Sequence, residues 1–314
     1  MSDTNKWADS DHKWNIIEER KYMWHQSQID RFAAVIGLSP GMSVADIGCG
    51  LGYLGWTYWK YYGQGGSYTG VDCSSELVVE ATENSQSWSE GGTVSFITGD
   101  CYSIPLEDNS VDVSMCQTLL QHLEFPEKAV LEMVRITKPG GTVVCKDLDN
   151  VSRVMSIGYS SISEDDQIDD ILFQKRMQLI DAKGRKNLGY GDMSIGSKIP
   201  RLMQEAGLSQ LQGLCNERLE FLNPPYEEPE QKHRIAIMQR FTGEVSEEVK
   251  NKAKVEYRKC YLAGGGKPES FESDYKRLVF LNAELRRKMV EGVSAGSLYF
   301  CAGGANFLCF IGRK

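Results

Sequence analysis

Residues 44–52 read Val-Ala-Asp-Ile-Gly-Cys-Gly-Leu-Gly, an apolar run that ends in glycines at every second position. This pattern is typical of a strand that turns directly into a helix. Glycines let a ligand approach the backbone, because no Cβ stands in the way. The start of the following helix presents unpaired backbone N–H groups. The stretch therefore predicts a strand, a ligand-binding loop and a helix.

Short apolar runs alternate with helical patterns between residues 30 and 150. The predicted strands are 43–48, 67–72, 93–98, 111–116 and 142–146, and the predicted helices are 52–62, 75–85 and 126–137. Ser74 is a typical N-cap, and Pro139-Gly140-Gly141 predicts a turn. Strands that alternate with helices favour a parallel sheet with right-handed crossovers. We therefore expect an α/β doubly wound fold.

This alternation stops after residue 150, where an acidic run and a long charged segment follow. The chain is expected to divide into an N-terminal helical arm (1–40), a cofactor-binding core (41–150), an insertion (151–198), a core helix and strand (199–223), a helical insertion (224–296) and a C-terminal core strand (297–314). The two insertions are predicted to form a lid over the site, because loops at the carboxyl edge of such sheets carry function.

Composition and charge exclude several classes of protein and of partner. The chain is 41% hydrophobic and 25% charged, which excludes a disordered protein, and no apolar run approaches the roughly 18 residues that span a bilayer. A net charge of −8 disfavours a nucleic-acid partner. The nine cysteines form no C-x-x-C pair, so no metal site is expected. With no signal-peptide pattern, we expect a cytoplasmic protein with no membrane partner, and a homodimer is compatible with the sequence.

Acidic residues stand at three successive predicted strand ends: Asp46, Asp72 and Asp100. Parallel strands bring such ends to one edge of the sheet. A dinucleotide-binding loop, G-x-G-x-x-G, would need glycine at 53, which is Tyr53 here, and Asp46 would repel a pyrophosphate. S-adenosylmethionine carries a sulfonium and an ammonium and no phosphate, so Asp46 favours it. Asp72 can accept the ribose hydroxyls, and Asp100 can accept a hydrogen bond from the adenine amino group.

Residues 42–149 resemble class I S-adenosylmethionine-dependent methyltransferases, in particular the small-molecule branch that includes ubiquinone-biosynthesis enzymes (methyltransferase types 11 and 25). The matching pieces are VADIGCGLG (44–52), GVD (70–72), GDCYSIPLEDNSVDVSMC (99–116), QTLLQHL (117–123) and KPGG (138–141). The resemblance implies a Rossmann-like, doubly wound, seven-stranded sheet of strand order 3-2-1-4-5-7-6, with an N-terminal helical arm and two helical insertions that form the lid.

The resemblance also implies a set of cofactor-binding residues. Glycine-loop residues would line the methionine and ribose, and Gln117 would lie beside the methionine, where relatives commonly have asparagine. The N-terminal arm would close the site. The full set is Tyr22, Trp24, Asp46, Gly48, Cys49, Gly50, Gly52, Asp72, Cys73, Asp100, Cys101 and Gln117.

Methyl transfer from a sulfonium is a direct displacement that requires alignment and exclusion of water. His122 falls in the segment that faces the methyl group in relatives, which often have His-His where this chain has Gln121-His122. We predict that His122 is a general base or positions the acceptor, with Asp147 or Asp149 as its partner. The alternative is that His122 packs or caps its helix.

The predicted function is transfer of a methyl group to an O, N or S atom of a small molecule (EC 2.1.1.-). One alternative is an NAD(P)-dependent oxidoreductase on a Rossmann fold, which Asp46 and Tyr53 disfavour. Another is a catalytically silent, methyltransferase-like partner subunit, whose glycine loop or strand-end acids would be degraded. A further motif, Asn223-Pro224-Pro225-Tyr226, spells the catalytic loop of adenine and glutamine amide methyltransferases, but its late position predicts a simple turn.

Overall fold

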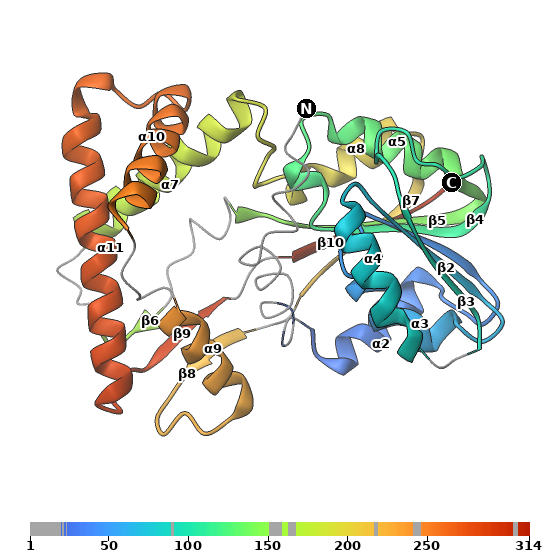
Figure 1. The fold of residues 1–314 in the computed structure, drawn as a ribbon, viewed down its shortest axis with the longest axis horizontal. Coiled ribbons are helices and arrows are strands. Elements are labelled where there is room, and N and C mark those ends of the chain that lie inside the picture. Colours follow the sequence, from blue (N-terminus) through green and yellow to red (C-terminus); the bar gives the residue numbers. More distant parts are fainter. Residues whose placement is uncertain are drawn as a thin grey trace. The chain divides into compact units, whose positions relative to one another are not determined.

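The computed structural model describes residues 20, 22, 24–88, 91–150, 159–162, 168–216, 219–240, 246–303 and 307–314. The chain divides into two compact units (Figure 1). Unit 1 comprises Met1–Asp149, Ser194–Glu217 and Phe307–Lys314, and unit 2 comprises Asn150–Met193 and Arg218–Asn306.

Unit 1 is built on a seven-stranded sheet of order β3-β2-β1-β4-β5-β10-β7. The strands are β1 (Ser43–Ile47), β2 (Ser67–Asp72), β3 (Thr93–Thr98), β4 (Val111–Gln117), β5 (Thr137–Leu148), β7 (Ser209–Cys215) and β10 (Phe307–Arg313). The first five strands run parallel, and β10 is antiparallel to both β5 and β7. Counted along the chain within this sheet, the order is 3-2-1-4-5-7-6, so the predicted Rossmann-like fold is confirmed.

The helices of unit 1 connect these strands as their sequences predict. They are α2 (Gln26–Ile36), α3 (Tyr53–Tyr62), α4 (Ser75–Asn84), α5 (Pro126–Ile136) and α8 (Ile199–Glu205), with short 3₁₀ turns η2 (Ser85–Ser87), η3 (Leu120–His122) and η5 (Gly196–Lys198). Ser74 caps α4, because its hydroxyl accepts a hydrogen bond from the Leu77 N–H at 3.3 Å. The apolar stripe of α5 (Ala129, Val130, Met133, Ile136) is fully buried.

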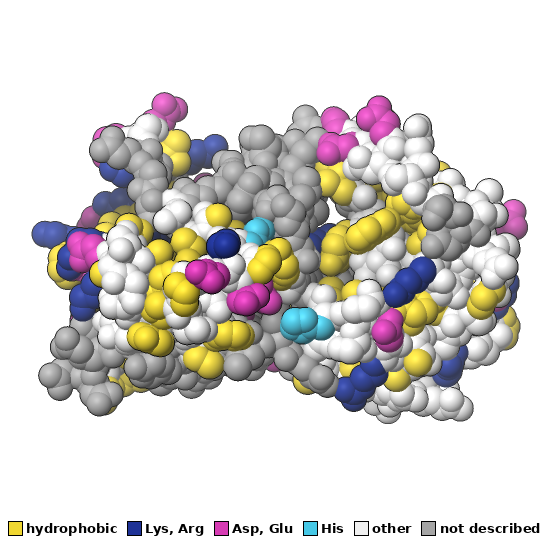
Figure 2. Space-filling model, turned by 90° about the horizontal axis from the view of Figure 1, so that it is seen from below, with side chains coloured by type: hydrophobic (Ala, Val, Ile, Leu, Met, Phe, Trp, Pro, Cys, Tyr) yellow, Lys and Arg dark blue, Asp and Glu magenta, His cyan; other side chains and the backbone are white. Residues whose placement is uncertain are grey.

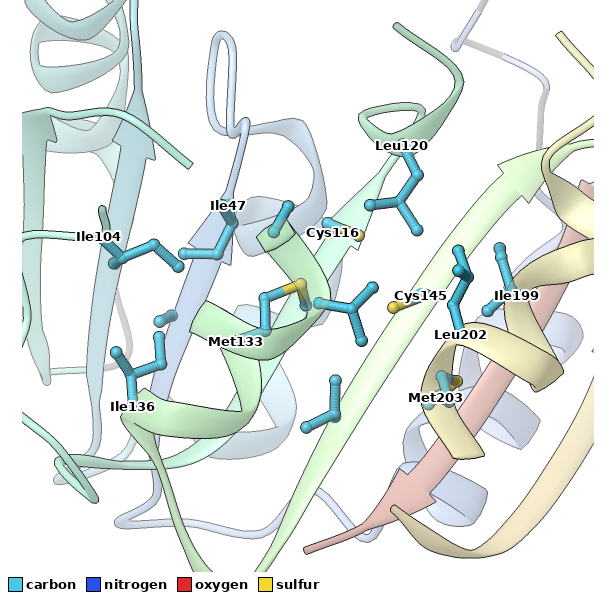
Figure 3. Packing of buried hydrophobic residues seen from close by; sticks show 14 of the residues in the cluster. Ile47, Ile104, Cys116, Leu120, Met133, Ile136, Cys145, Ile199, Leu202 and Met203 are labelled. Atoms are coloured by element: carbon cyan, nitrogen blue, oxygen red, sulfur yellow. The ribbon is translucent and has the colours of Figure 1, made fainter. Parts of the chain in front are cut away.

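Alternate residues of the strands face opposite sides of the sheet. Ile47, Cys116 and Cys145 join a core cluster with residues of α5 and α8, including Met133 and Leu202 (Figure 3). The next residue in β5, Lys146, faces the other side, where its ammonium lies over side chains of α2 and α3. The sheet therefore separates an apolar core from a face that carries polar groups.

Three segments differ from the sequence prediction. Segment 199–223 was expected to lie wholly in the core, but β8 (Leu219–Leu222) belongs to a small sheet of unit 2. The expected turn Pro139-Gly140-Gly141 lies within β5, because Thr137 already pairs with Val111 and the register shifts before Thr142 pairs with Val113. Segment 297–314 was expected to be one core strand, but only β10 joins the core sheet, while β9 (Phe300–Gly303) lies in unit 2. All three differences depend on which strands pair across the chain, and a local hydrophobic pattern does not show which strand is the partner.

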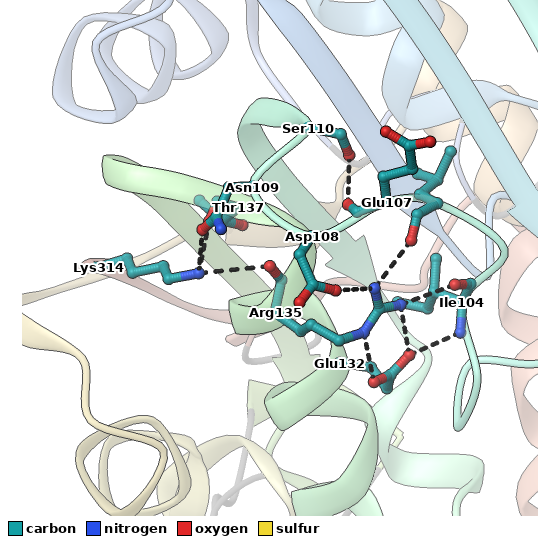
Figure 4. A network of polar contacts seen from close by, with 10 residues as sticks. Ile104, Glu107, Asp108, Asn109, Ser110, Glu132, Arg135, Thr137 and Lys314 are labelled. Atoms are coloured by element: carbon teal, nitrogen blue, oxygen red, sulfur yellow. Dashed lines mark hydrogen bonds and ion pairs between the residues drawn. The ribbon is translucent and has the colours of Figure 1, made fainter.

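A polar network holds the segment between β3 and β4 in place (Figure 4). The Arg135 guanidinium donates to the carbonyl oxygens of Ile104 and Leu106, each at 2.8 Å, and to the carboxylate of Asp108 at 2.7 Å. It also pairs with Glu132, which in turn accepts the Ile104 N–H at 2.8 Å. Helix α5 thus fixes the course of the loop that begins at Asp100.

Unit 2 combines helices with a small antiparallel sheet of order β6-β9-β8. Its elements are β6 (Tyr159–Ser160), α7 (Ile168–Asn187), β8 (Leu219–Leu222), α9 (Pro229–Arg240), α10 (Glu247–Ala263), η6 (Pro268–Ser270), α11 (Phe271–Ser294) and β9. Helices α7 and α10 cross closely, since a Cβ on Gly184 would lie 1.7 Å from the Cys260 carbonyl oxygen. The proposed role of the insertions as a lid stays a prediction.

The Asn-Pro-Pro-Tyr motif lies after β8 in unit 2. The Asn223 side chain accepts from Gln231 at 3.1 Å, and the Tyr226 hydroxyl donates to the Leu298 carbonyl oxygen at 3.0 Å. The Asn223 and Tyr226 side chains are thus bonded within the protein, and the Tyr226 N–H donates to the Asn223 carbonyl oxygen at 3.1 Å, which closes a turn as predicted for this position.

None of the helices in the described part of the chain is both long and apolar enough to cross a bilayer. On the face shown in Figure 2, the described acidic and basic side chains lie in small groups among hydrophobic ones.

Gly55 in α3 tests the packing between this helix and β2. A Cβ on Gly55 would lie 2.2 Å from the ring of Tyr68, which is 1% exposed. We expect Gly55→Ala to lower the free energy of unfolding by about 1–3 kcal/mol, because overpacking outweighs the gain in helix propensity of about 1 kcal/mol. Chemical denaturation measures this change.

Gly292→Ala in α11 is the matched control. The nearest atom to its Cβ would be 3.2 Å away, so we expect a change within about 1 kcal/mol. Equal effects at both glycines would contradict the prediction.

Candidate functional site

The glycine loop after β1 adopts a backbone that only glycine tolerates well. Gly48, Gly50 and Gly52 have φ angles of 69°, 53° and 79°. The N–H groups of Gly48 and Cys49 donate to the Val71 carbonyl oxygen at 2.8 and 3.1 Å, which ties the loop to β2. No heavy atom lies within 4 Å of the position that a Cβ on Gly50 would take. The loop therefore leaves open space at its middle glycine.

Asp72 ends β2 and holds this loop from the neighbouring strand. Its Oδ2 accepts the Gly50 N–H at 2.8 Å, and its Oδ1 accepts the Ser74 N–H at 3.0 Å. The residue is only 9% exposed. Each carboxylate oxygen has a second lone pair that can accept a further hydrogen bond. The Asp72 carboxylate can therefore hold two adjacent hydroxyls of a ligand beside the loop.

Asp46 lies beneath the loop and is 1% exposed. The Tyr68 hydroxyl donates to its Oδ2 at 2.9 Å. Burial raises the pKa of Asp46 to about 7, while the Tyr68 hydrogen bond and the charges of Arg20 and Lys146 oppose this shift. The site thus contains a carboxyl group that titrates near neutral pH.

The end of β3 supplies an exposed acidic residue, Asp100. The cysteines near this edge carry neutral thiols. Asp100 lies at the surface, and its Oδ1 accepts the Tyr102 N–H at 2.9 Å. Burial raises the pKa of Cys101 to about 12, and nearby Asp100 adds to this rise. Burial likewise raises the pKa values of Cys73 and Cys49. These cysteines are therefore poor nucleophiles at neutral pH.

Strand β4 ends in a strained turn at the same edge. Gln117 is 4% exposed and pairs with Lys146 of β5. Thr118 has a φ of 54°, which is uncommon for a β-branched residue. Its N–H donates to the Lys146 carbonyl oxygen at 2.8 Å, and its hydroxyl accepts from Arg20 Nη2 at 3.0 Å. Strain of this kind is common at functional sites.

The described part of the N-terminal arm packs against this edge. Trp24 is 9% exposed and makes an edge-on contact with Phe32, with ring centroids 5.3 Å apart. Tyr22 is half-buried. The Arg20 carbonyl oxygen accepts from the Tyr53 hydroxyl at 3.0 Å.

The structure shows what the carboxylate of Asp147 contacts. Asp147 is fully buried; its Oδ2 accepts the Gln121 N–H at 3.2 Å and its Oδ1 accepts the Leu148 N–H at 3.0 Å. Asp147 therefore holds the η3 turn that carries His122 through the backbone of that turn. Lys146 cannot offset its charge by pairing with it, since adjacent strand residues face opposite sides of the sheet.

The structure thus gathers Asp46, the glycine loop and Asp72 at the carboxyl edges of β1 and β2, with Asp100 at the end of β3. Sequence reasoning did not single out Arg20, Tyr68 or Thr118. No local pattern pointed to Arg20 or Thr118, whose contact joins residues 98 positions apart.

Comparisons with known proteins agree with this geometry. A family model described as a methyltransferase domain matches residues 45–145, about a third of the chain. The chain is 36% identical over 109 residues to a demethylmenaquinone methyltransferase of Desulfitobacterium hafniense, an alignment covering 35% of this chain and 43% of that protein. It is 30% identical over 114 residues to a malonyl-[acyl-carrier protein] O-methyltransferase of Pectobacterium atrosepticum, covering 36% and 42% of the two chains. The aligned part is thus less than half the length of these relatives.

A solved structure is similar in fold over a longer part of the chain. Phosphoethanolamine N-methyltransferase 2 of Haemonchus contortus, in complex with S-adenosyl-L-methionine, superposes with a TM-score of 0.51 at 16% identity, covering 100% of this chain and 60% of that one. The methyltransferase resemblance predicted from the motifs is confirmed for residues 45–145.

Asp147 gives rise to a pH-dependent prediction. Burial raises its pKa to about 7, against about 3.9 in an unfolded chain. A carboxyl group whose pKa is raised by folding contributes stability that is complete below about pH 4 and is lost as the pH rises through 7. Because alanine lacks this dependence, we expect the difference in melting temperature between the parent and Asp147→Ala to be larger at pH 5 than at pH 8.

Asp112→Ala is the control. The pKa of Asp112 is lowered by its hydrogen bonds to Lys138 and Ser43, which outweigh burial, so its contribution is constant between pH 5 and 8. A difference for Asp147→Ala that grows with pH would contradict the assignment.

Proposed function

We propose that this protein transfers a methyl group from S-adenosylmethionine to an O, N or S atom of a small-molecule acceptor. The observation that carries the proposal is the joint placement of an open glycine loop and the Asp72 carboxylate within a domain that matches the methyltransferase family. The names of these relatives give demethylmenaquinone and a malonyl group on an acyl-carrier protein as acceptors, which supports a metabolite-type acceptor for this chain.

The residues present fit the cofactor. The space in front of Gly50 admits a ligand against the loop, and Asp72 can accept both ribose hydroxyls. Asp46 supplies negative charge for the ammonium and sulfonium, and Asp100 is exposed to accept from the adenine amino group. Gln117, Cys49, Cys73 and Cys101 complete the pocket wall in this proposal. When bound, the cofactor supplies an electrophilic methyl group on sulfur.

The turn after β4 would carry the residue that deprotonates or orients the acceptor. Asp147 holds η3 through backbone N–H groups, so His122 would be presented by a fixed turn. His122 then removes a proton from a hydroxyl or ammonium acceptor, or orients it. In this proposal Asp147 is a positioning residue for that turn, and Tyr22 and Trp24 of the arm exclude water from the cofactor.

The rival functions have less support. An oxidoreductase would place a pyrophosphate against the loop, close to the buried Asp46, and no comparison favours one. A silent partner subunit would not be expected to keep the loop glycines together with Asp46 and Asp72 in one hydrogen-bonded arrangement. The cytoplasmic location and the homodimer stay predictions.

The direct test is product identification. We expect a metabolite extract incubated with the protein and methyl-labelled S-adenosylmethionine to yield a labelled small molecule in mass spectrometry. Extract without the protein is the control. Label found only in macromolecules would contradict the small-molecule acceptor.

Asp72→Ala is expected to weaken binding of S-adenosylmethionine and of its demethylated product about ten- to hundredfold. The loss reflects a pair of charge-assisted hydrogen bonds of roughly 1.5–3 kcal/mol. Calorimetry measures both affinities. Asp112→Ala removes a carboxylate at the opposite end of β4 and should leave them unchanged; equal affinities for all three proteins would refute the ribose assignment.

His122→Ala is expected to lower turnover by about 10²–10⁴-fold and to leave cofactor affinity nearly intact, because a base acts on the acceptor. The measurement is the rate with the identified acceptor, together with the melting temperature of the variant. A stable variant with parental turnover at several pH values would remove His122 from the mechanism and indicate a thiolate or neutral amine acceptor.

A further inference from the structure

Lys146 is a fully buried lysine whose ammonium lies in a box of aromatic rings. The residue is 1% exposed. Its Nζ is 4.5 Å from the ring centroid of Tyr58, 4.8 Å from that of Phe32 and 4.9 Å from that of Trp24. It also donates to the Tyr58 hydroxyl at 2.5 Å. Burial lowers the pKa of Lys146, whereas ring faces stabilise a desolvated cation, so the box offsets part of the cost of burying the ammonium.

Buried charge needs a functional or structural reason, because burial of an ammonium opposes folding. Two observations connect Lys146 to the candidate site. It pairs with Gln117 across β4 and β5, and its backbone carbonyl oxygen accepts from the strained Thr118. Its side chain lies on the same face of the sheet as Asp46, because Asp46 pairs with Met115, two residues before Gln117.

Asp46 and Lys146 are therefore opposite charges buried on one face of one sheet, held apart by β4. Each is 1% exposed, so little solvent screens their attraction. The other charged or titratable groups that face Asp46 are Tyr68 and Asp72 of β2, Arg20 of the arm, Cys49 of the loop and Tyr62 of α3. Those that face Lys146 are Tyr53 and Tyr58 of α3 and Cys309 of β10.

We propose that Lys146 is a positioning residue for the cofactor: its boxed ammonium adds to the Arg20 guanidinium as a counter-charge that favours the ionised form of Asp46, which can hold a cationic ligand. The inference rests on the proposed function, since it concerns binding of S-adenosylmethionine. Lys146 itself touches neither cofactor nor acceptor. It acts through the field that it exerts on Asp46.

The pH dependence of binding distinguishes this role from a structural one. With the pKa of Asp46 at about 7, half of the carboxyl groups are ionised at pH 7 before the ligand binds. A cationic ligand prefers the ionised form, so affinity rises as the pH passes through the pKa of Asp46, until the α-ammonium of the ligand itself begins to lose its proton at about pH 8 in every variant alike. Loss of the Lys146 charge raises the pKa of Asp46 and moves this rise to higher pH.

The experiment measures the affinity of S-adenosylmethionine by calorimetry from pH 6 to pH 9 for the parent and for Lys146→Met. Loss of the Lys146 charge moves the pKa of Asp46 upward, so a smaller fraction of the carboxyl groups is ionised at pH 7, and we expect about two- to fivefold weaker binding there. At pH 9 the variant should bind as tightly as the parent or more tightly, because the repulsion between Lys146 and the cationic ligand is gone.

Two controls separate charge from packing. Lys146→Arg keeps the charge and should keep the parental pH midpoint. Lys138→Met removes a lysine at the other end of β5, which pairs with Asp112 at 2.8 Å, and should also leave the midpoint unchanged. If Lys146→Met does not fold, Lys146→Gln removes the charge and keeps a donor for the Tyr58 hydroxyl.

The outcomes are distinct. No binding by the parent would overturn the proposed function itself. Binding by the parent, with a neutral variant weakened by one constant factor at every pH, would show a packing role and overturn the counter-charge. A pH midpoint that moves upward in the neutral variant, and not in the two controls, supports it.

Discussion

The carboxylate of Asp72 joins three segments of the chain that must meet for the site to exist. It accepts the Gly50 N–H of the loop after β1 and the Ser74 N–H at the start of α4, while it ends β2 itself. In a place that is only 9% exposed, each of these N–H groups would otherwise be costly to bury. Together with the Val71 carbonyl oxygen, which accepts from Gly48 and Cys49, this carboxylate links the glycine loop to β2 and to the start of α4.

Adjacent residues of strand β5 carry buried charged groups into different surroundings on opposite faces of the sheet. Lys146 faces the aromatic side chains of α2 and α3, and Asp147 faces the η3 turn on the other side. Both are almost completely buried, and each charge is accommodated by different chemistry. Ring faces and one hydroxyl surround the ammonium, whereas backbone N–H groups surround the carboxylate. Because successive residues of a strand point to opposite faces, the ammonium and the carboxylate lie on different sides of the sheet.

Burial also determines the electrostatic character of the site. The pKa values of Asp46 and Asp147 are both raised to about 7, while the thiols of Cys49, Cys73 and Cys101 stay protonated. Shifted carboxyl groups of this kind gather at functional sites. Here they lie on opposite faces of the same sheet edge, one beneath the glycine loop and one behind the turn after β4. Proton binding near neutral pH is thus coupled to both parts of the candidate site.

The sequence by itself determined the parallel half of the sheet and the acids at its edge, because these depend on local pattern. Alternating apolar runs and helical stripes predicted β1 to β4 within one residue at each end, and the glycine loop with Asp46 and Asp72 followed from residue chemistry. The family resemblance implied that the last strand lies between β5 and β7, and only the tertiary structure decided that segment 297–314 divides between two sheets and what surrounds Lys146. The physical reason is separation along the chain: Lys146 meets Tyr58 across 88 residues and Arg20 meets Thr118 across 98, and no local periodicity encodes such contacts.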